Sequence, residues 1–205
     1  MRDSAFAGFL PALWSGLRAT TWPEAIAVLL GLAYVLLAMK QNRWCWVAGG
    51  VSSLILAWLS ARSRLPMQAL LQLWYVGMAA YGWRRWSQPQ ASRIGTWPLR
   101  LHAVGVAASL AASVLIARWL AIETQAAWPY LDSATTVLSL LATWLVARMK
   151  LENWLYWLAI DAVLVFLFAA QGLMFTATLF ALYLVLAAAG YVSWLRKYRA
   201  QTSPA

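Results

Sequence analysis

The sequence predicts an all-α integral membrane protein with seven transmembrane helices. Of its 205 residues, 63% are hydrophobic and only 11% are charged, and the mean hydropathy is +0.66. This balance is typical neither of a soluble domain nor of a disordered chain. The apolar residues form runs long enough to cross a bilayer as helices, and short polar segments separate these runs. The chain is therefore expected to pass through the membrane several times.

Residues 1–22 are expected to form a helix that lies in the membrane plane. Pro11 interrupts a short apolar run here, which disfavours a cleaved signal peptide. The apolar side chains share one helical stripe, as in interfacial helices. The members of this stripe are Phe6, Phe9, Leu10, Leu13, Trp14 and Leu17.

Seven apolar spans follow this segment, and several are near the lower length limit for a spanning helix. We divide the rest of the chain into a first three-helix unit (23–86), a loop with a linking transmembrane helix (87–131), a second three-helix unit (132–195) and a basic tail (196–205). The spans cover approximately 23–40, 44–61, 65–86, 98–121, 132–149, 153–170 and 174–195.

The two three-helix units resemble each other at an offset of 108 residues, which indicates an internal repeat. Because three helices and one linking helix make an even number of crossings, both units enter the membrane from the same side. The expected architecture is thus three-plus-one-plus-three, with parallel repeats related by an axis along the membrane normal. The matched pairs are Glu24 with Asp132, Lys40 with Arg148, Trp46 with Trp154, Leu65 with Leu173, Tyr75 with Tyr183, Gly82 with Gly190 and Trp86 with Trp194.

The net charge of +10 comes from basic residues in the short loops, so we interpret it as a topology signal and expect no nucleic-acid partner. Assigning the 16 Lys and Arg residues to alternating sides places five with the N-terminus and eleven with the C-terminus. Excess Lys and Arg stay in the cytoplasm. The predicted location is the cell inner membrane, with the N-terminus outside and the C-terminus in the cytoplasm. Most of the fifteen Trp residues flank apolar runs and are expected to anchor helices at the lipid headgroups.

The sequence offers no catalytic residues, no metal site and no cofactor-binding motif. Cys45 is its only cysteine and His102 its only histidine, which excludes a disulfide within the chain and a Cys or His metal cluster. Both are interpreted as packing residues. There is also no glycine loop of the kind that binds ATP.

A candidate binding site centres on Asp161, the one charged residue in the apolar run that follows Glu152. Trp154, Trp157 and Asp161 are spaced i, i+3 and i+7, so they share a helix face. At about 1.5 Å per residue, Asp161 lies about 12 Å into a hydrocarbon layer about 30 Å thick. An ionisable group at that depth usually marks a substrate path. The alternative is a purely structural Asp that is hydrogen-bonded to its neighbours.

Other polar residues at membrane depth complete the candidate site. Gln68, Gln72 and Tyr75 form one helical stripe. Asp132, Thr136, Ser139 and Thr143 form another. Tyr183 lies on the last helix. Such Ser and Thr residues also serve helix packing. A cavity with stacking aromatic rings, one anion and several amides and hydroxyls fits a flat, cationic, hydroxylated solute. A single carboxylate at mid-membrane offers few sites for a coupling ion, so the sequence favours facilitated diffusion over ion-coupled transport.

These residues resemble the PnuC family of bacterial vitamin-precursor transporters. The family's Trp-x-x-Trp-x-x-x-Asn/Asp pattern is matched by Trp154, Trp157 and Asp161. The likeness spans roughly residues 24–194 and includes the segments 129–132, 148–154, 171–172, 71–72 and 81–86. It implies uptake of nicotinamide riboside for NAD synthesis, trapping of the substrate by a cytoplasmic kinase, and a homotrimer.

The sequence departs from the family pattern at two positions. Asp161 stands where many nicotinamide riboside carriers have Asn, and Ala79 stands where an Asn often precedes the Tyr-Gly-Trp turn. Relatives that carry thiamine or riboflavin share the fold, so these vitamins are alternative substrates. A membrane scaffold or receptor without transport activity is the alternative from another class.

Overall fold

The protein consists of eight α-helices in a computed structural model that describes residues 3–64, 66–88, 93–123 and 128–202. Residues 1–2, 65, 89–92, 124–127 and 203–205 lie outside these ranges. They include part of the predicted linker and Leu65, so the matched pair of Leu65 with Leu173 is not tested. The helices are α1 (Asp3–Ala19), α2 (Trp22–Met39), α3 (Trp44–Arg62), α4 (Pro66–Trp86), α5 (Leu99–Glu123), α6 (Pro129–Ala147), α7 (Asn153–Ala170) and α8 (Met174–Thr202).

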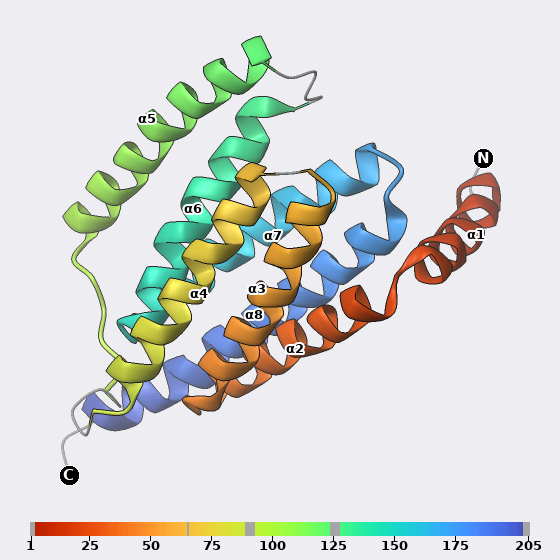
Figure 1. Cartoon of the computed structure of the whole chain (residues 1–205). Helices are drawn as coiled ribbons and strands as arrows, with labels where there is room; N and C mark the ends of the chain where they lie inside the picture. The colour runs from red at the N-terminus through yellow and green to blue at the C-terminus, as the bar shows by residue number, and fades with distance from the viewer. Residues whose placement is uncertain (1–2, 65, 89–92, 124–127, 203–205) are drawn as a thin grey trace.

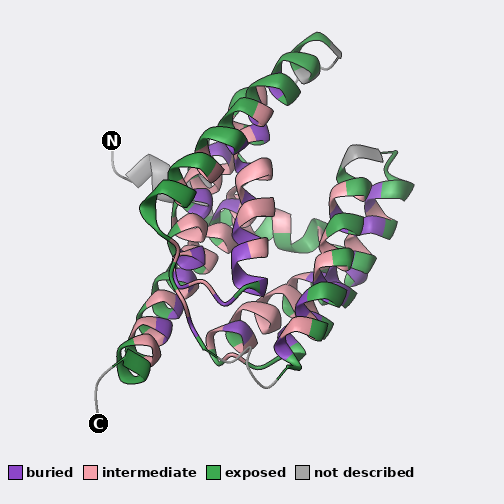
Figure 2. Ribbon diagram, turned by 90° about the vertical axis from the view of Figure 1, so that its left-hand side faces the viewer, coloured by how far each residue is buried: buried purple, intermediate pink, exposed green. Residues whose placement is uncertain are grey.

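The helices form two groups that meet along one interface (Figure 1). Within the groups, α3 packs against α2 and α4, and α7 packs against α6 and α8. The groups contact each other through α2 with α8 and through α4 with α6. At the periphery, α5 lies beside α6, and α1 lies beside α8 on the opposite side of the molecule. Buried residues gather on the facing sides of the helices, and exposed residues cover the outer sides (Figure 2).

Six of the helices are long and apolar enough to cross a membrane, compared with the seven predicted: α2, α3, α5, α6, α7 and α8. The difference is α4, which has 21 residues but carries Gln68, Gln72, Arg84 and Arg85. These polar residues lower its hydropathy without shortening it. The last helix also continues beyond the predicted end of its span at residue 195, so the described part of the basic tail is helical.

The same backbone features recur 108 residues apart in the two groups. Gln41 and Met149 both adopt the left-handed conformation, with φ of 58° and 53°, and the side chains of this pair contact each other at 3.8 Å. Arg64 and Gly172 are the second such pair, with φ of 57° and 75°. Each pair ends a helix and turns the chain into the next one, so the α2–α3 turn has the geometry of the α6–α7 turn.

Four buried tryptophans join the groups at the end where α2, α4, α6 and α8 converge. Trp46 packs edge-on against Trp86 with ring centroids 5.4 Å apart, and Trp154 packs in the same way against Trp194 at 5.6 Å. Trp86 and Trp194 are themselves 6.3 Å apart. These four indoles are core residues, so the expectation that most tryptophans anchor helices at the lipid headgroups does not hold for them.

Each central indole also forms a hydrogen bond to the opposite group. Trp86 Nε1 donates to the carbonyl of Ala147 at the end of α6 (3.2 Å), and Trp194 Nε1 donates to the carbonyl of Ala38 at the end of α2 (3.1 Å). The last carbonyls of a helix have no partner within the helix. The Trp86 indole supplies that partner for Ala147, whereas the Ala38 carbonyl also accepts from the Gln41 amide at 2.9 Å. Both indole bonds join the two groups. Cys45, the only cysteine, is fully buried in this core.

The described part of the linker before α5 is attached to the α6–α7 turn. Gly95 exchanges backbone hydrogen bonds with Met149 and Leu151 at 3.0 and 2.9 Å. The Glu152 carboxylate accepts a bond from the Trp97 amide at 2.8 Å and lies 3.6 Å from His102 Nε2. His102 thus helps to fix the start of α5.

The N-terminal helix α1 exposes apolar side chains, as expected for an interfacial helix. Leu10, Trp14 and Leu17 are at least half exposed, and the Arg18 guanidinium lies over the Trp14 ring at 5.1 Å. With 17 residues, α1 is not among the candidate spans.

The close contact between the Trp46 ring and Gly82 leads to a prediction about stability. A Cβ atom at Gly82 would overlap the Trp46 ring, whereas a Cβ at Gly77, on the same helix, would meet nothing within 4 Å. We expect Gly82→Ala to lower the unfolding free energy by about 1–3 kcal/mol through overpacking. Gly77→Ala is the matched control and should be neutral or stabilising, because Ala favours helix. Thermal melts of the purified variants followed by circular dichroism would test this; equal melting temperatures would contradict it.

Candidate functional site

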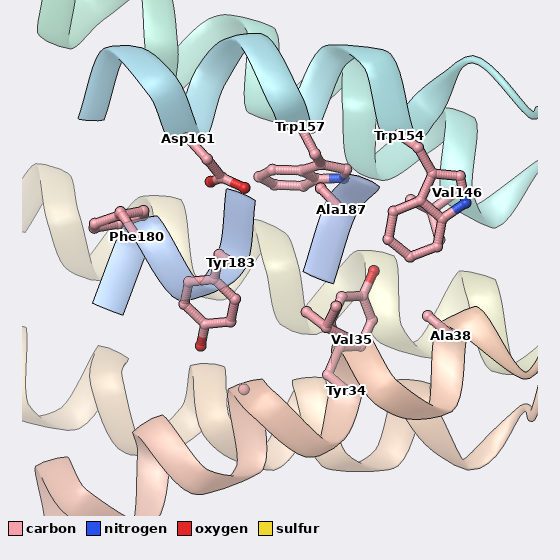
Figure 3. Close-up of a pocket in the computed structure, with 11 residues that line it drawn as sticks. Tyr34, Val35, Ala38, Val146, Trp154, Trp157, Asp161, Phe180, Tyr183 and Ala187 are labelled. Carbon is pink, nitrogen blue, oxygen red and sulfur yellow. The ribbon is translucent and has the colours of Figure 1, made fainter. Parts of the chain in front are cut away.

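A pocket of about 190 Å³ lies between α2 of the first group and α7 and α8 of the second. Figure 3 shows aromatic side chains from all three helices around it. The residues that line it are Gly31, Tyr34, Val35, Ala38, Val146, Trp154, Trp157, Asp161, Phe180, Tyr183 and Ala187. It is a partly enclosed apolar site with one acidic group, and both helix groups contribute to it.

One face of α7 provides the chemistry of this pocket. Trp154, Trp157 and Asp161 leave the helix on the same side, toward α2 and α8 (Figure 3). Asp161 is only 4% exposed, and none of the described residues forms a hydrogen bond or salt bridge with it. Burying an unpaired carboxylate is costly. The arrangement suits a cation that enters the pocket and neutralises this carboxylate.

Aromatic rings from α8 and α2 form the other walls. Phe180 stacks on Phe168 with ring centroids 5.3 Å apart, and Tyr183 lies 6.0 Å from Phe180. A Cβ at Gly31 would lie 2.8 Å from the Tyr183 hydroxyl, so only glycine allows α2 to approach that ring so closely. A flat ligand would therefore lie among aromatic rings, where stacking and cation–π contacts are available.

A second pocket of about 140 Å³ adjoins the first. Gly31, Tyr34 and Trp157 line both pockets. The residues found only in the second are Trp46, Gly49, Ser52, Ser53, Tyr75, Ala79 and Thr143. This pocket contains hydroxyl groups and, among its lining residues, no charged side chain.

The predicted site residues divide among several places. Trp154, Trp157, Asp161 and Tyr183 line the first pocket, and Tyr75 lines the second. The Tyr75 hydroxyl is 2.6 Å from Ser139 Oγ, so Ser139 lies directly behind that wall.

The structure does not bring the remaining predicted residues to these pockets. Gln68, Asp132 and Thr136 line a separate cavity of about 390 Å³ between α4, α5 and α6. Gln72 is buried and lines neither of the two central pockets.

Two important wall residues, Tyr34 and Phe180, were not found from the sequence. Tyr34 is the single aromatic residue in the apolar stretch 25–39 of α2. That isolation was the available signal. Phe180 lies one turn before Tyr183 and one turn after Thr176 on α8, so the polar residues on that helix face were the available signal.

Spanning helices around a part-enclosed aromatic pocket, shared between two halves of the molecule, are the arrangement expected of a membrane transport protein for small molecules. A model of the nicotinamide mononucleotide transporter family matches residues 21–196. The chain therefore belongs to this family of transporters, which includes the PnuC proteins. Membership confirms the predicted family and shows that the protein is a transporter and not an enzyme.

Individual relatives are similar over nearly their whole length. The riboflavin/roseoflavin transporter RibM of Streptomyces davaonensis is 26% identical over 192 residues, 89% of each chain. The nicotinamide riboside transporter PnuC of Escherichia coli is 24% identical over 214 residues, 90% of each chain. The crystal structure of the vitamin B3 transporter PnuC has the same fold, with a TM-score of 0.70, 21% identity and coverage of 94% and 90% of the two chains.

Proposed function

We propose that this protein carries nicotinamide riboside across the inner membrane by facilitated diffusion. The observation that carries the proposal is Asp161, a buried carboxylate without a cationic partner among the described residues, one turn from Trp157 in an aromatic pocket. Nicotinamide riboside has a flat, positively charged ring that could neutralise this carboxylate while it contacts the indole. The Escherichia coli relative, named for this substrate, supports the proposal.

The transport path in this proposal uses two parallel repeats. We take α2–α4 and α6–α8 as the repeats, with α5 as the linking helix and α4 as the seventh span. At about 1.5 Å per residue the 21 residues of α4 extend about 32 Å, enough to cross a bilayer. The matching turns and tryptophan contacts support the repeat. Rocking of the two groups would open the pockets to alternate sides. A kinase that phosphorylates the substrate in the cytoplasm would retain it; that link and the homotrimer stay predictions.

Riboflavin is the second candidate substrate, because RibM is similar to this chain over the same length. The aromatic pocket walls would also stack on its flat ring system. Its ring is uncharged at neutral pH, however, and would leave Asp161 unpaired. The charge of the pocket therefore favours the nicotinamide compound.

The distribution of basic residues predicts the orientation of the chain. With eleven of the 16 Lys and Arg residues on the C-terminal side, a reporter enzyme fused after Ala205 should be cytoplasmic. A reporter inserted at Gln125, which lies outside the described residues, should be external. The measurement is paired alkaline phosphatase and fluorescent protein fusions expressed at low level. The opposite pattern would reverse the orientation and leave the helix arrangement unchanged.

Transport is expected to need neither ATP nor an ion gradient, because a single carboxylate lines the central pockets. In sealed proteoliposomes loaded with unlabelled nicotinamide riboside, counterflow of labelled substrate should proceed equally with and without ionophores. Accumulation of unmodified substrate above its external concentration, lost when a gradient is collapsed, would show active transport instead.

Trp157 and Asp161 should both contribute to binding. A desolvated cation over an indole gains about 2 kcal/mol, and 1.4 kcal/mol is about tenfold in affinity. We therefore expect Trp157→Ala to weaken nicotinamide riboside binding about thirtyfold in calorimetric titrations. Asp161→Asn keeps the shape and one acceptor, so its loss should be smaller for this ligand.

Trp58→Ala is the matched control for the indole substitution. Trp58 is 47% exposed on α3 and lines neither central pocket. Its removal should leave affinity unchanged. Wild-type affinity in Trp157→Ala and Asp161→Asn as well would mean that this face of α7 only packs against its neighbours.

A further inference from the structure

The two central pockets are lined by corresponding residues of the two helix groups. Five residues of the second pocket precede five residues of the first by 108 positions, the separation that also relates Gln41 to Met149. The pairs are Trp46 with Trp154, Gly49 with Trp157, Ser53 with Asp161, Tyr75 with Tyr183 and Ala79 with Ala187. The second pocket is therefore the counterpart of the first, built from α3 and α4 in place of α7 and α8.

The chemistry of the two pockets differs at two of these pairs. Asp161 corresponds to Ser53, so one pocket has a charge where the other has a hydroxyl. Trp157 corresponds to Gly49, and a Cβ at Gly49 would lie 2.8 Å from the Tyr34 ring. The Tyr34 ring thus occupies space that a side chain at Gly49 would need. As a result, Tyr34 and Trp157 form the shared boundary of an ionic, aromatic pocket and a hydroxyl-lined pocket.

The polar groups of the second pocket have hydrogen-bonding capacity to spare. Ser139 donates its proton to the Thr136 carbonyl at 2.7 Å, so Tyr75 donates to Ser139 and keeps an acceptor oxygen. Thr143 donates to the Ser139 carbonyl at 2.8 Å and also keeps acceptor capacity. Ser53 forms no hydrogen bond with the described residues, and Trp46 Nε1 is buried without a partner among them. Both donors and acceptors are therefore available.

Neither pocket is large enough by itself for a nucleoside-like ligand. Their volumes are about 190 and 140 Å³, and clefts that enclose small organic ligands usually start at about 300 Å³. A ligand made of a flat ring joined to a chain of hydroxyls would match the two pockets in both size and chemistry.

We propose that the ligand lies across both pockets, with its aromatic ring beside Asp161 and its sugar in the hydroxyl-lined pocket formed by Ser53, Tyr75 and Thr143. This inference rests on the proposed transport function and extends it. The hydroxyl-lined pocket, formed by α3 and α4 of the first repeat together with Thr143 of α6, recognises the ribose or ribityl group. The pocket formed mainly by α7 and α8 recognises the ring. Selection would then favour ring compounds that carry a polyhydroxylated chain over the same rings without one.

The test compares ligands with and without the sugar. The purified full-length protein is titrated with nicotinamide riboside and with 1-methylnicotinamide, which keeps the charged ring but has a methyl group in place of ribose. Riboflavin and lumichrome, which lacks the ribityl chain, form the second pair. We expect Ser53→Ala and Thr143→Val each to weaken binding of the sugar-bearing ligand about three- to tenfold, the range of a single hydrogen bond. Binding of the sugar-free ligand should not change.

Thr135→Val is the matched control. Thr135 and Thr143 lie on α6, both are 6% exposed, and both donate to the carbonyl four residues earlier. Only Thr143 lines the second pocket. Thr135→Val should therefore leave binding of both ligands unchanged, while Asp161→Asn should weaken the two cationic ligands by the same factor.

The outcomes separate this inference from the function on which it rests. Equal losses for sugar-bearing and sugar-free ligands, or no loss for either, would overturn the sugar subsite and leave the transporter proposal standing. Failure of the wild-type protein to bind either ligand pair would overturn both. If a variant does not fold, the wild-type protein is titrated with 2′-deoxy nicotinamide riboside, and affinity equal to that of the parent compound would overturn the subsite.

Discussion

The two hydrogen bonds from indole to carbonyl are the contacts on which the arrangement of the two helix groups depends. Trp86 reaches the end of α6 and Trp194 reaches the end of α2, so each group donates a hydrogen bond to a backbone carbonyl of the other, and the Ala147 carbonyl depends on it as the end of its helix. Unpaired carbonyls are costly where water is scarce. The central pockets lie along the same interface, and α2 contributes to both. Their shape is thus set by how these helix ends are joined.

The helices were largely predictable because each follows from the pattern of apolar and polar residues in its own stretch of sequence. Apolar runs and polar turns gave their order and approximate bounds, and the 108-residue offset anticipated the matching turns at Gln41 and Met149. Only the length of α4 favours a membrane span, because its Gln and Arg residues lower its hydropathy. Helix periodicity also could not show that Trp46, Trp86, Trp154 and Trp194 meet in one core, since that contact joins residues far apart in the chain.

The candidate site was only partly predictable, for a related reason. Spacing placed Trp154, Trp157 and Asp161 on one face of α7, and that face lines a pocket. Spacing does not show which neighbour a face meets. The stripes that begin at Gln68 and Asp132 are equally regular, yet these two residues line a separate cavity between α4, α5 and α6. Tyr75 and Ser139, further along the same stripes, lie at the second central pocket. Tyr34 belongs to no polar stripe. Its place in the wall of both pockets depends on the absence of a side chain at Gly49 on the neighbouring helix.

The burial of Cys45 has a practical consequence for the study of motion in this transporter. The chain has one thiol, and its side chain is fully buried in the tryptophan core. Cysteines introduced at exposed positions of α3 and α7 would therefore react with spin labels or fluorophores while the native thiol stays protected. Distances between such probes would report how far the two helix groups separate, without replacement of a core residue.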